Sequence, residues 1–276
     1  METGDKCADL PDLVIGQCSV CELIQAVSFS HVNLAYYADA NYYGGVPEKE
    51  RERQWHWNRK RVARLKALLP AAVDRKVLDY GCGTGGFLEQ AHGAFLEVAG
   101  FDVNESICSL HNALGWKCFS SIADVPGDVD VITLFHVLEH LPKPWLLLTD
   151  LMNRFPMAET FVIEVPNTQE ALNSVFKNRA YRQNHFSSEH VYYFTSKTLR
   201  LIVEFAGLEV LVDSQLQRYT LGNNLGWLIN NRGGGQDQWD FFNDEQLNEH
   251  YEQALISQGA ADSVFMVCGR RSPTGQ

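Results

Sequence analysis

A glycine-rich segment at residues 79–87 carries residue types that can hold a nucleoside-bearing ligand. Asp79 ends an apolar run, and Gly81, Gly83 and Gly85 follow at alternate positions before a helical pattern begins. Glycine adopts positive φ angles without strain and lets a ligand approach the backbone closely. The first amides of a helix lack partners within that helix and carry partial positive charge. The segment therefore predicts a strand, a tight turn and a helix that together form a ligand-binding loop.

The spacing Gly81-x-Gly83-x-x-Gly86 also fits a dinucleotide-binding loop, with the acidic residue Asp102 further along the chain. Asp79 favours a different ligand, because a carboxylate at the mouth of the turn repels a pyrophosphate and attracts a cation. S-adenosylmethionine carries an ammonium and a sulfonium and no phosphate. We therefore favour S-adenosylmethionine over a nicotinamide dinucleotide. A tight turn that binds no ligand is the third alternative.

Two more acidic residues follow predicted strands. Asp102 ends the apolar run 98–101, where a ribose is commonly bound in folds of this kind, and it could instead cap the helix that begins near Asn104. Asp124 follows a short strand predicted at 116–119. It could accept a hydrogen bond from an adenine amino group or cap its own loop. Both alternatives stay open at each position.

Three segments in the middle of the chain have a recognisable order. They read Leu-Asp-Tyr-Gly-Cys-Gly-Thr-Gly-Gly-Phe at 78–87, Gly-Phe-Asp at 100–102 and Phe-His-Val-Leu-Glu-His-Leu-Pro at 135–142. In combination they resemble the class I S-adenosylmethionine-dependent methyltransferases. The similarity covers roughly residues 47–215 and continues in His-Phe-Ser-Ser-Glu-His-Val-Tyr-Tyr-Phe-Thr at 185–195. Within that class the chain is similar to the small-molecule branch, which includes ubiquinone-biosynthesis-like and sugar-modifying enzymes.

The resemblance implies a cofactor, S-adenosyl-L-methionine, which leaves as S-adenosyl-L-homocysteine, and a set of residues that bind it. The residues that hold the cofactor in that family match Asp79, Gly81, Gly83 and Asp102. Those that line its methionine half match Phe135 and His136. The full set of residues that we expect at the cofactor is Asp79, Gly81, Cys82, Gly83, Gly85, Phe87, Asp102, Val103, Asp124, Phe135 and His136.

The coarse pattern alternates strands and helices from residue 75 onward, which predicts a mainly parallel sheet covered on both faces. Together with the resemblance it indicates an α/β, Rossmann-like fold with seven strands, of which the last is antiparallel. We predict four segments. They are an N-terminal arm at 1–46, the cofactor-binding core at 47–216, an insertion at 217–262 that covers the acceptor or forms a dimer contact, and the last core strand with its tail at 263–276.

Methyl transfer from a sulfonium is an in-line displacement, and a base that removes the proton helps when the acceptor is a hydroxyl. His140 directly follows Glu139 near the end of a predicted strand, and neutral imidazole can accept a proton near neutral pH. His185 and His190 are the other candidate bases, and Glu139 could position a histidine or cap the next segment. Each histidine could equally be a structural residue.

We therefore predict a methyltransferase that acts on a small molecule, at a hydroxyl oxygen, with a histidine base. Transfer to carbon or nitrogen on the same fold is the first alternative. An NAD-dependent oxidoreductase and a non-catalytic cofactor-binding protein are alternatives from other classes. The candidate contacts with the acceptor are aromatic or cationic side chains, namely Tyr36, Tyr37, Tyr43, Arg179 and Arg182. Packing of an N-terminal arm and solvation of the surface are the structural alternatives for these residues.

Composition limits the classes of partner. The chain has 276 residues and a net charge of −11, which argues against a nucleic-acid backbone as partner because such binding depends on Lys and Arg. We interpret the basic residues at 59–66 as the solvated face of a helix. No run is long and apolar enough to span a bilayer, and the first residues lack a signal-peptide profile. We expect a cytoplasmic protein without a membrane partner, and a homodimer stays open.

Seven scattered cysteines argue against a disulfide framework. Cys18-x-x-Cys21 is similar to one half of an N-terminal zinc module found in related methyltransferases, but the other pair is missing and only Cys7 lies upstream. Structural zinc normally takes four ligands. We therefore predict a metal-free hairpin, and zinc bound with the help of Cys7 and His31 is the alternative.

Overall fold

A computed structural model describes residues 2–7, 9–43, 48–69 and 71–271. The predicted boundary between residues 46 and 47 and the predicted tail after residue 271 lie outside the described residues. The chain forms two compact units. The first unit contains Met1–Val32, Leu138–Leu146 and Ile163–Val267, and the second contains Asn33–Val137, Leu147–Val162 and Cys268–Gln276.

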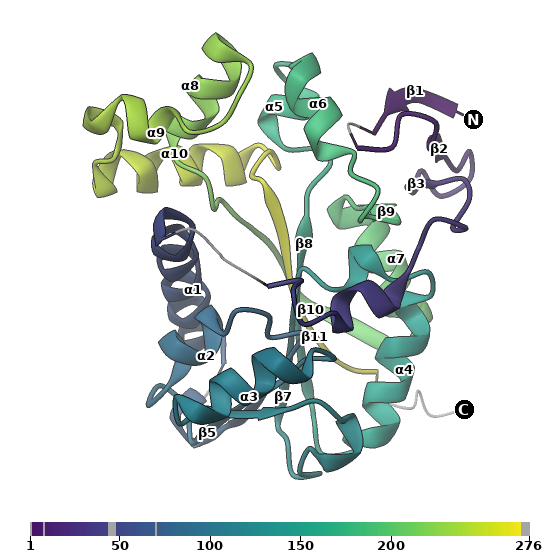
Figure 1. The fold of residues 1–276 in the computed structure, drawn as a ribbon, viewed down its shortest axis with the longest axis vertical. Helices are drawn as coiled ribbons and strands as arrows, with labels where there is room; N and C mark the ends of the chain where they lie inside the picture. The colour runs from purple at the N-terminus through teal and green to yellow at the C-terminus, as the bar shows by residue number, and fades with distance from the viewer. Residues whose placement is uncertain (1, 8, 44–47, 70, 272–276) are drawn as a thin grey trace. The chain divides into compact units, whose positions relative to one another are not determined.

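Seven strands form one sheet in the order β10-β11-β8-β7-β4-β5-β6. Figure 1 labels β5, β7, β8, β10 and β11 of this sheet. The strands are β4 (Lys76–Tyr80), β5 (Glu97–Phe101), β6 (Lys117–Phe119), β7 (Val131–Phe135), β8 (Thr160–Pro166), β10 (Leu208–Leu216) and β11 (Ser263–Arg270). β4 pairs in parallel with β5 and β7, β5 pairs in parallel with β6, and the last strands are antiparallel. The predicted Rossmann-like sheet is confirmed.

The strand order reverses beside β4, because the chain runs from β4 to β5 on one side and later returns to β7 on the other side. In open α/β sheets, ligands bind outside the carboxyl ends of the strands at such a reversal. All five residues of β7 are buried, as are the five inner residues of β8. Continuous apolar runs of this kind are typical of parallel strands covered on both faces.

The second unit contains several helices, of which those predicted after Gly85 and near Asn104 are observed at Gly86–Ala91 and Glu105–Ala113. Its helical elements are η1 (Leu34–Ala38), α1 (Glu48–Leu68), η2 (Ala72–Asp74), α2 (Gly86–Ala91), α3 (Glu105–Ala113) and η3 (Ile122–Asp124). The helix α4 (Pro144–Arg154) begins in the first unit and continues in the second. Asn104 caps α3, since its side chain accepts from the amide of Ile107 (3.0 Å). The alternative that Asp102 caps this helix is therefore wrong. No helix in the described part of the chain has the length and apolar character to cross a bilayer.

The first unit contains a second, four-stranded sheet in the order β1-β2-β3-β9. Its strands are β1 (Glu2–Lys6), β2 (Val14–Gln17), β3 (Ile24–Ala26) and β9 (Tyr192–Tyr193). The turn between β2 and β3 carries Cys18 and Cys21, as the predicted hairpin requires. Cys18 is exposed, whereas Cys7 is buried in an apolar cluster with Phe186 and Tyr193. Within the described ranges, no group of three potential metal ligands includes either cysteine of the turn.

The remaining elements of the first unit are short helices. They are η4 (Leu138–His140), α5 (Ala171–Ser174), α6 (Arg179–His185), α7 (Ser196–Phe205), α8 (Leu221–Asn230), α9 (Gly235–Gln238), η5 (Asp240–Phe242) and α10 (Glu245–Ser257). The predicted insertion thus has structure of its own. α8 packs on α9 backbone to backbone, since a Cβ atom at Gly235 would overlap the carbonyl of Gly222. The role of this insertion as lid or dimer contact stays a prediction.

The core under β4 can be tested with Leu78→Ala. Leu78 is 0% exposed, so truncation removes buried contacts and leaves a cavity. We expect the free energy of unfolding to fall by about 2–5 kcal/mol, measured by urea denaturation. Leu96→Ala is the matched control, because Leu96 is 62% exposed and its truncation should change stability by no more than about 0.5 kcal/mol. Equal effects of the two substitutions would contradict the assignment of the core.

Candidate cofactor site and histidine cluster

Asp79 lies at the end of β4 and is only 3% exposed. The hydroxyl of Thr133 on β7 donates to its Oδ1 atom (2.7 Å). Burial raises the pKa of Asp79 to about 7, although the hydrogen bond from Thr133 and the positive charge of Arg61 act in the opposite direction. Arg61 is itself buried on α1, with its guanidinium 4.6 Å from the ring centre of Phe135. The prediction of a solvated face is therefore wrong for Arg61.

The loop after β4 needs glycine at three positions. Gly81, Gly83 and Gly85 have φ angles of +76°, +51° and +79°, in the left-handed region that favours glycine. The ring Nε2–H of His111 on α3 donates to the carbonyl of Gly83 (2.8 Å). A Cβ atom at Gly85 would overlap the same imidazole ring. His111 thus supports the loop from the side of α3, a contact that no local sequence pattern indicates.

Asp102 links the loop to the end of β5. It is 3% exposed, and its Oδ2 atom accepts from the Gly83 amide (2.9 Å) and from the Tyr43 hydroxyl (3.0 Å). Its Oδ1 atom accepts from the amide of Asn104 (3.0 Å). The expected neighbours, Gly83 and Asp102, are therefore brought together by a direct hydrogen bond.

The side chain of Cys82 packs into the core below the loop. Its Sγ atom lies 3.5 Å from that of Cys118, which in turn lies 2.9 Å from the Sγ atom of Cys108. All three are buried, free thiols. The hydrogen bond with Cys118 and burial raise the pKa of Cys82 well above its usual range. Cys82 therefore contributes to the loop through its backbone, whose amide donates to Phe101 O (3.0 Å).

The other expected cofactor residues differ in their surroundings. Phe87 and Phe135 are buried and in edge contact, with ring centres 5.1 Å apart. His136 follows β7 with a φ of +58°, which is rare outside glycine and concentrates at functional sites. Val103 and Asp124 are exposed. All of the expected cofactor residues belong to the second unit.

The tyrosines of the N-terminal arm form one aromatic cluster. Tyr42 makes edge contacts with Tyr36, Tyr37 and Tyr43, with ring centres 5.0, 5.2 and 4.7 Å away. This packing agrees with the structural alternative for the arm. Tyr43 additionally bonds to Asp102, so it lies at the expected cofactor residues.

Glu139, His140 and His190 come together in the first unit. The rings of His140 and His190 are 4.9 Å apart, and Nε2 of His140 lies 4.0 Å from Oε1 of the fully buried Glu139. Nδ1 of His140 is 2.9 Å from the carbonyl of Glu189. One donor atom from each of the three residues lies within 4.8 Å of the others, so this group could hold a metal ion.

His185 and the two candidate arginines lie on or at the ends of α6. His185 is buried among aromatic rings, with those of Phe186 and Tyr181 centred 5.4 and 5.9 Å away. Arg182 donates to a backbone carbonyl of the same unit, and its guanidinium lies 5.8 Å from the ring centre of Phe186. Arg179 begins the helix. The structure thus places Arg182 in packing contacts, and contact of either arginine with an acceptor stays a prediction.

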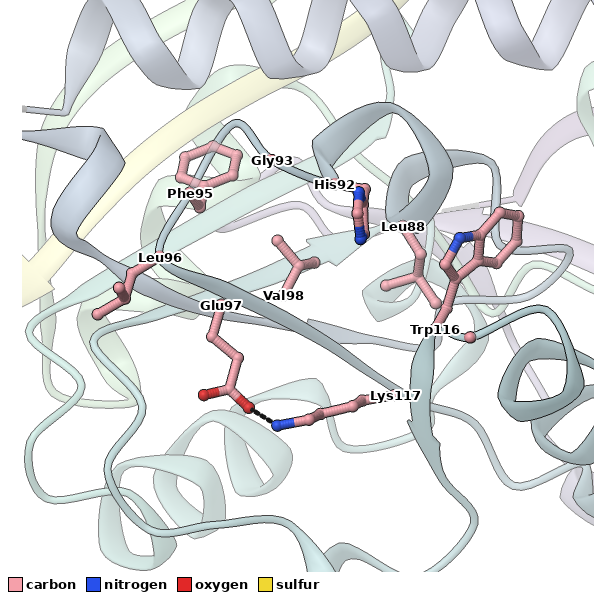
Figure 2. Close-up of a pocket in the computed structure, with 10 residues that line it drawn as sticks. Leu88, His92, Gly93, Phe95, Leu96, Glu97, Val98, Trp116 and Lys117 are labelled. Atoms are coloured by element: carbon pink, nitrogen blue, oxygen red, sulfur yellow. Dashed lines mark hydrogen bonds and ion pairs between the residues drawn. The ribbon is translucent and has the colours of Figure 1, made fainter.

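A pocket of about 450 Å³ lies elsewhere in the second unit (Figure 2). Its lining includes Phe95, Val98 and Trp116, and Lys117 forms an ion pair with Glu97 there. Glu97 and Lys117 are the first residues of β5 and β6, so the pocket lies at the amino ends of these strands. Ligands of α/β sheets bind at the opposite, carboxyl ends. This pocket contains none of the expected cofactor residues.

The structure is that of an α/β protein with a glycine-rich loop at the point where the strand order reverses. Residues 54–212 match the Methyltransferase domain family, which is more than half of the chain. The chain belongs to this family, and its class I, S-adenosylmethionine-dependent character agrees with the predicted one. The alternative of a nicotinamide-dependent oxidoreductase is therefore not retained.

Among curated proteins, a Ubiquinone biosynthesis O-methyltransferase of Thiobacillus denitrificans is 35% identical over 81 residues. The match covers 25% of this chain and 35% of that protein, so it spans about a third of the relative's length.

Two solved structures have the same fold. One is from the complex between the Haloferax volcanii Trm112 methyltransferase activator and a methyltransferase (15% identity, TM-score 0.56, 87% of this chain and 98% of that chain). The other is magnesium protoporphyrin IX methyltransferase from Synechocystis PCC 6803 with bound S-adenosylhomocysteine (15%, 0.51, 85% and 96%).

The raised pKa of Asp79 predicts a pH dependence of stability. Between its ordinary value of 3.8 and about 7, the folded state binds a proton at Asp79 that the unfolded state has released. The contribution of Asp79 to stability is therefore present at low pH and is lost as the pH rises through about 7. We expect the unfolding free energy of the wild type to fall relative to that of Asp79→Asn as the pH rises from ~5 to ~8, because asparagine does not titrate. Denaturant titrations at a series of pH values measure this, and parallel curves would contradict it.

Proposed function

We propose that this protein transfers the methyl group of S-adenosyl-L-methionine to a hydroxyl oxygen of a small molecule, by in-line displacement. The single observation that carries the cofactor assignment is the Asp102 carboxylate, held against the Gly83 amide at the carboxyl edge of the sheet. A carboxylate at this position accepts from ribose hydroxyls in related nucleoside sites. Family membership supports the methyl donor.

The remaining cofactor contacts follow from the strand order. Asp79 is the second-last residue of β4 and His136 follows β7, so the two flank the reversal where α/β sheets bind ligands. In its ionised form Asp79 attracts the cationic methionine half of the cofactor. Phe135 and His136 line that half, and Asp124 accepts from the adenine amino group.

Two kinds of observation support an oxygen acceptor. The curated relative carries an O-methyltransferase name. The histidines supply the candidate base, since neutral imidazole accepts a proton near neutral pH and the hydrogen bond from Nδ1 of His140 to the Glu189 carbonyl orients its ring. Glu139 stabilises the imidazolium that forms, while His185 and His190 are the other candidate bases. Transfer to carbon or nitrogen is the alternative on the same fold.

The contacts with the acceptor, the cellular location and the partners are proposals as well. Tyr36, Tyr37, Arg179 and Arg182 are proposed to contact an oxygen-rich or anionic small molecule. We further propose a cytoplasmic enzyme without nucleic-acid or membrane partners. The insertion at 217–262 either covers the acceptor or joins two copies in a homodimer.

Asp102→Ala tests the cofactor assignment. Loss of the ribose acceptor should weaken S-adenosylhomocysteine binding by at least about tenfold, measured by isothermal titration, since a hydrogen bond to a charged group is lost. Asp128→Ala is the control, because Asp128 is an exposed partner of Lys76 and its loss should leave the affinity unchanged. Circular dichroism checks that both variants fold. Unchanged affinity of the Asp102 variant, or binding of NAD(H) without binding of S-adenosylhomocysteine, would overturn the assignment.

His140→Ala tests the base. We expect turnover with a labelled methyl donor and a panel of hydroxylated small molecules to fall by about 100-fold, because a general base contributes on this scale. Affinity for S-adenosylhomocysteine should change by less than about threefold, since the base does not contact the ribose. His92→Ala, on the pocket of Figure 2, is the matched control. Near-normal turnover would show that His140 is not the base. The same measurement would then be made on alanine variants of His185 and His190.

A further inference from the structure

The hydroxyl of Tyr43 occupies the acceptor atom that a ribose would use. Oδ2 of Asp102 already accepts from the Gly83 amide (2.9 Å) and from Tyr43 (3.0 Å), and Oδ1 accepts from the Asn104 amide (3.0 Å). A carboxylate oxygen has about two lone-pair sites. The two amides belong to the folded backbone of the loop and of the α3 cap. The Tyr43 hydroxyl is therefore the donor that a ribose hydroxyl can replace at Oδ2.

The ring of Tyr43 also fills the space that glycine leaves at position 83. A Cβ atom at Gly83 would lie 3.5, 3.6 and 3.8 Å from the Cε1, hydroxyl and Cζ atoms of Tyr43. Glycines in such loops leave room for a ligand to approach the backbone. In this structure the same room is taken by the phenol, so Tyr43 and a bound nucleoside compete for one position.

The segment that carries Tyr43 is attached in a way that allows it to move away. η1 contains no buried residue, and Tyr43 is only partly buried where its ring packs against the core cluster that includes Cys82 and Ile107. The side chain of Asn104 anchors the segment by donating to the carbonyls of Tyr37 (3.3 Å) and Asp39 (2.6 Å). Segments with little buried surface open at low free-energy cost, and ligand-binding gates are drawn from them.

We propose that residues 33–43 form a gate over the cofactor site, which Tyr43 closes by hydrogen bonding to Asp102 and which the cofactor's ribose opens by taking that bond. The inference rests on the proposed function, because it assigns the ribose to Asp102. The exchange replaces one neutral O–H donor on the carboxylate by another, so no charge is left unpaired in either state. The measured dissociation constant is then the intrinsic dissociation constant divided by the fraction of molecules whose gate is open.

Tyr43→Phe is the decisive variant, since it keeps the ring and removes the hydroxyl. The closed state loses a hydrogen bond to a charged group, so we expect S-adenosylhomocysteine to bind about three- to tenfold more tightly and to associate faster. Isothermal titration and stopped-flow mixing measure the two effects. Tyr42→Phe is the matched control, because the ring of Tyr42 lies in the same cluster, 4.7 Å from that of Tyr43. The tyrosine that donates to Asp102 is Tyr43. The affinity of Tyr42→Phe should stay within about twofold of wild type.

Hydrogen exchange gives a second readout that does not depend on affinity. Amides at 33–43 should exchange faster when S-adenosylhomocysteine is bound to the wild type, whereas a simple binding segment would become protected. In Tyr43→Phe they should already exchange fast without ligand. Equal affinity of wild type and Tyr43→Phe would overturn the gate alone, and weaker binding by the variant would make Tyr43 a cofactor contact instead. Absence of binding to both proteins would overturn the proposed function together with the gate.

Discussion

The hydrogen bond from the Gly83 amide to the Asp102 carboxylate is the interaction on which the site depends. It joins the turn after β4 to the end of β5, and the other oxygen of the same carboxylate accepts from the residue that caps α3. A buried carboxylate is costly unless donors surround it. The chain meets this requirement with backbone amides, which in turn demands the left-handed conformation at Gly83. One buried acid thus determines the loop, the start of the next helix and the position of the arm.

A second buried acid, Asp79 on the neighbouring strand β4, also links two elements of the site. Asp79 is bonded across the sheet to Thr133, so β4 and β7 are linked where the strand order reverses. Its protonation is balanced between burial on one side and Thr133 and Arg61 on the other. A cofactor cation would shift that balance toward the ionised form. On the proposed function, cofactor binding would therefore release a proton from this residue.

Local patterns predicted the parts of the fold that depend on local order. The helix expected near Asn104 is observed as Glu105–Ala113, and the strand, turn and helix around the glycines follow the predicted sequence of elements. Contacts between distant segments could not be predicted in the same way. Arg61 looks like part of a basic helix face, yet the packing of α1 buries it against Phe135. His111 and Tyr43 reach the glycine loop from elements whose placement no local pattern specifies.

The small sheet of the first unit has a consequence for synthesis of the protein on the ribosome. β3 pairs with β9 through Ile24 and Tyr193, and Cys7 packs beside Phe186, so β1, β2 and β3 complete their sheet with a strand that is translated much later. Until β9 emerges, the nascent chain carries an unpaired strand edge of the kind that promotes aggregation. β1, β2 and β3 therefore lack the last strand of their sheet while the long segment between β3 and β9 is being translated.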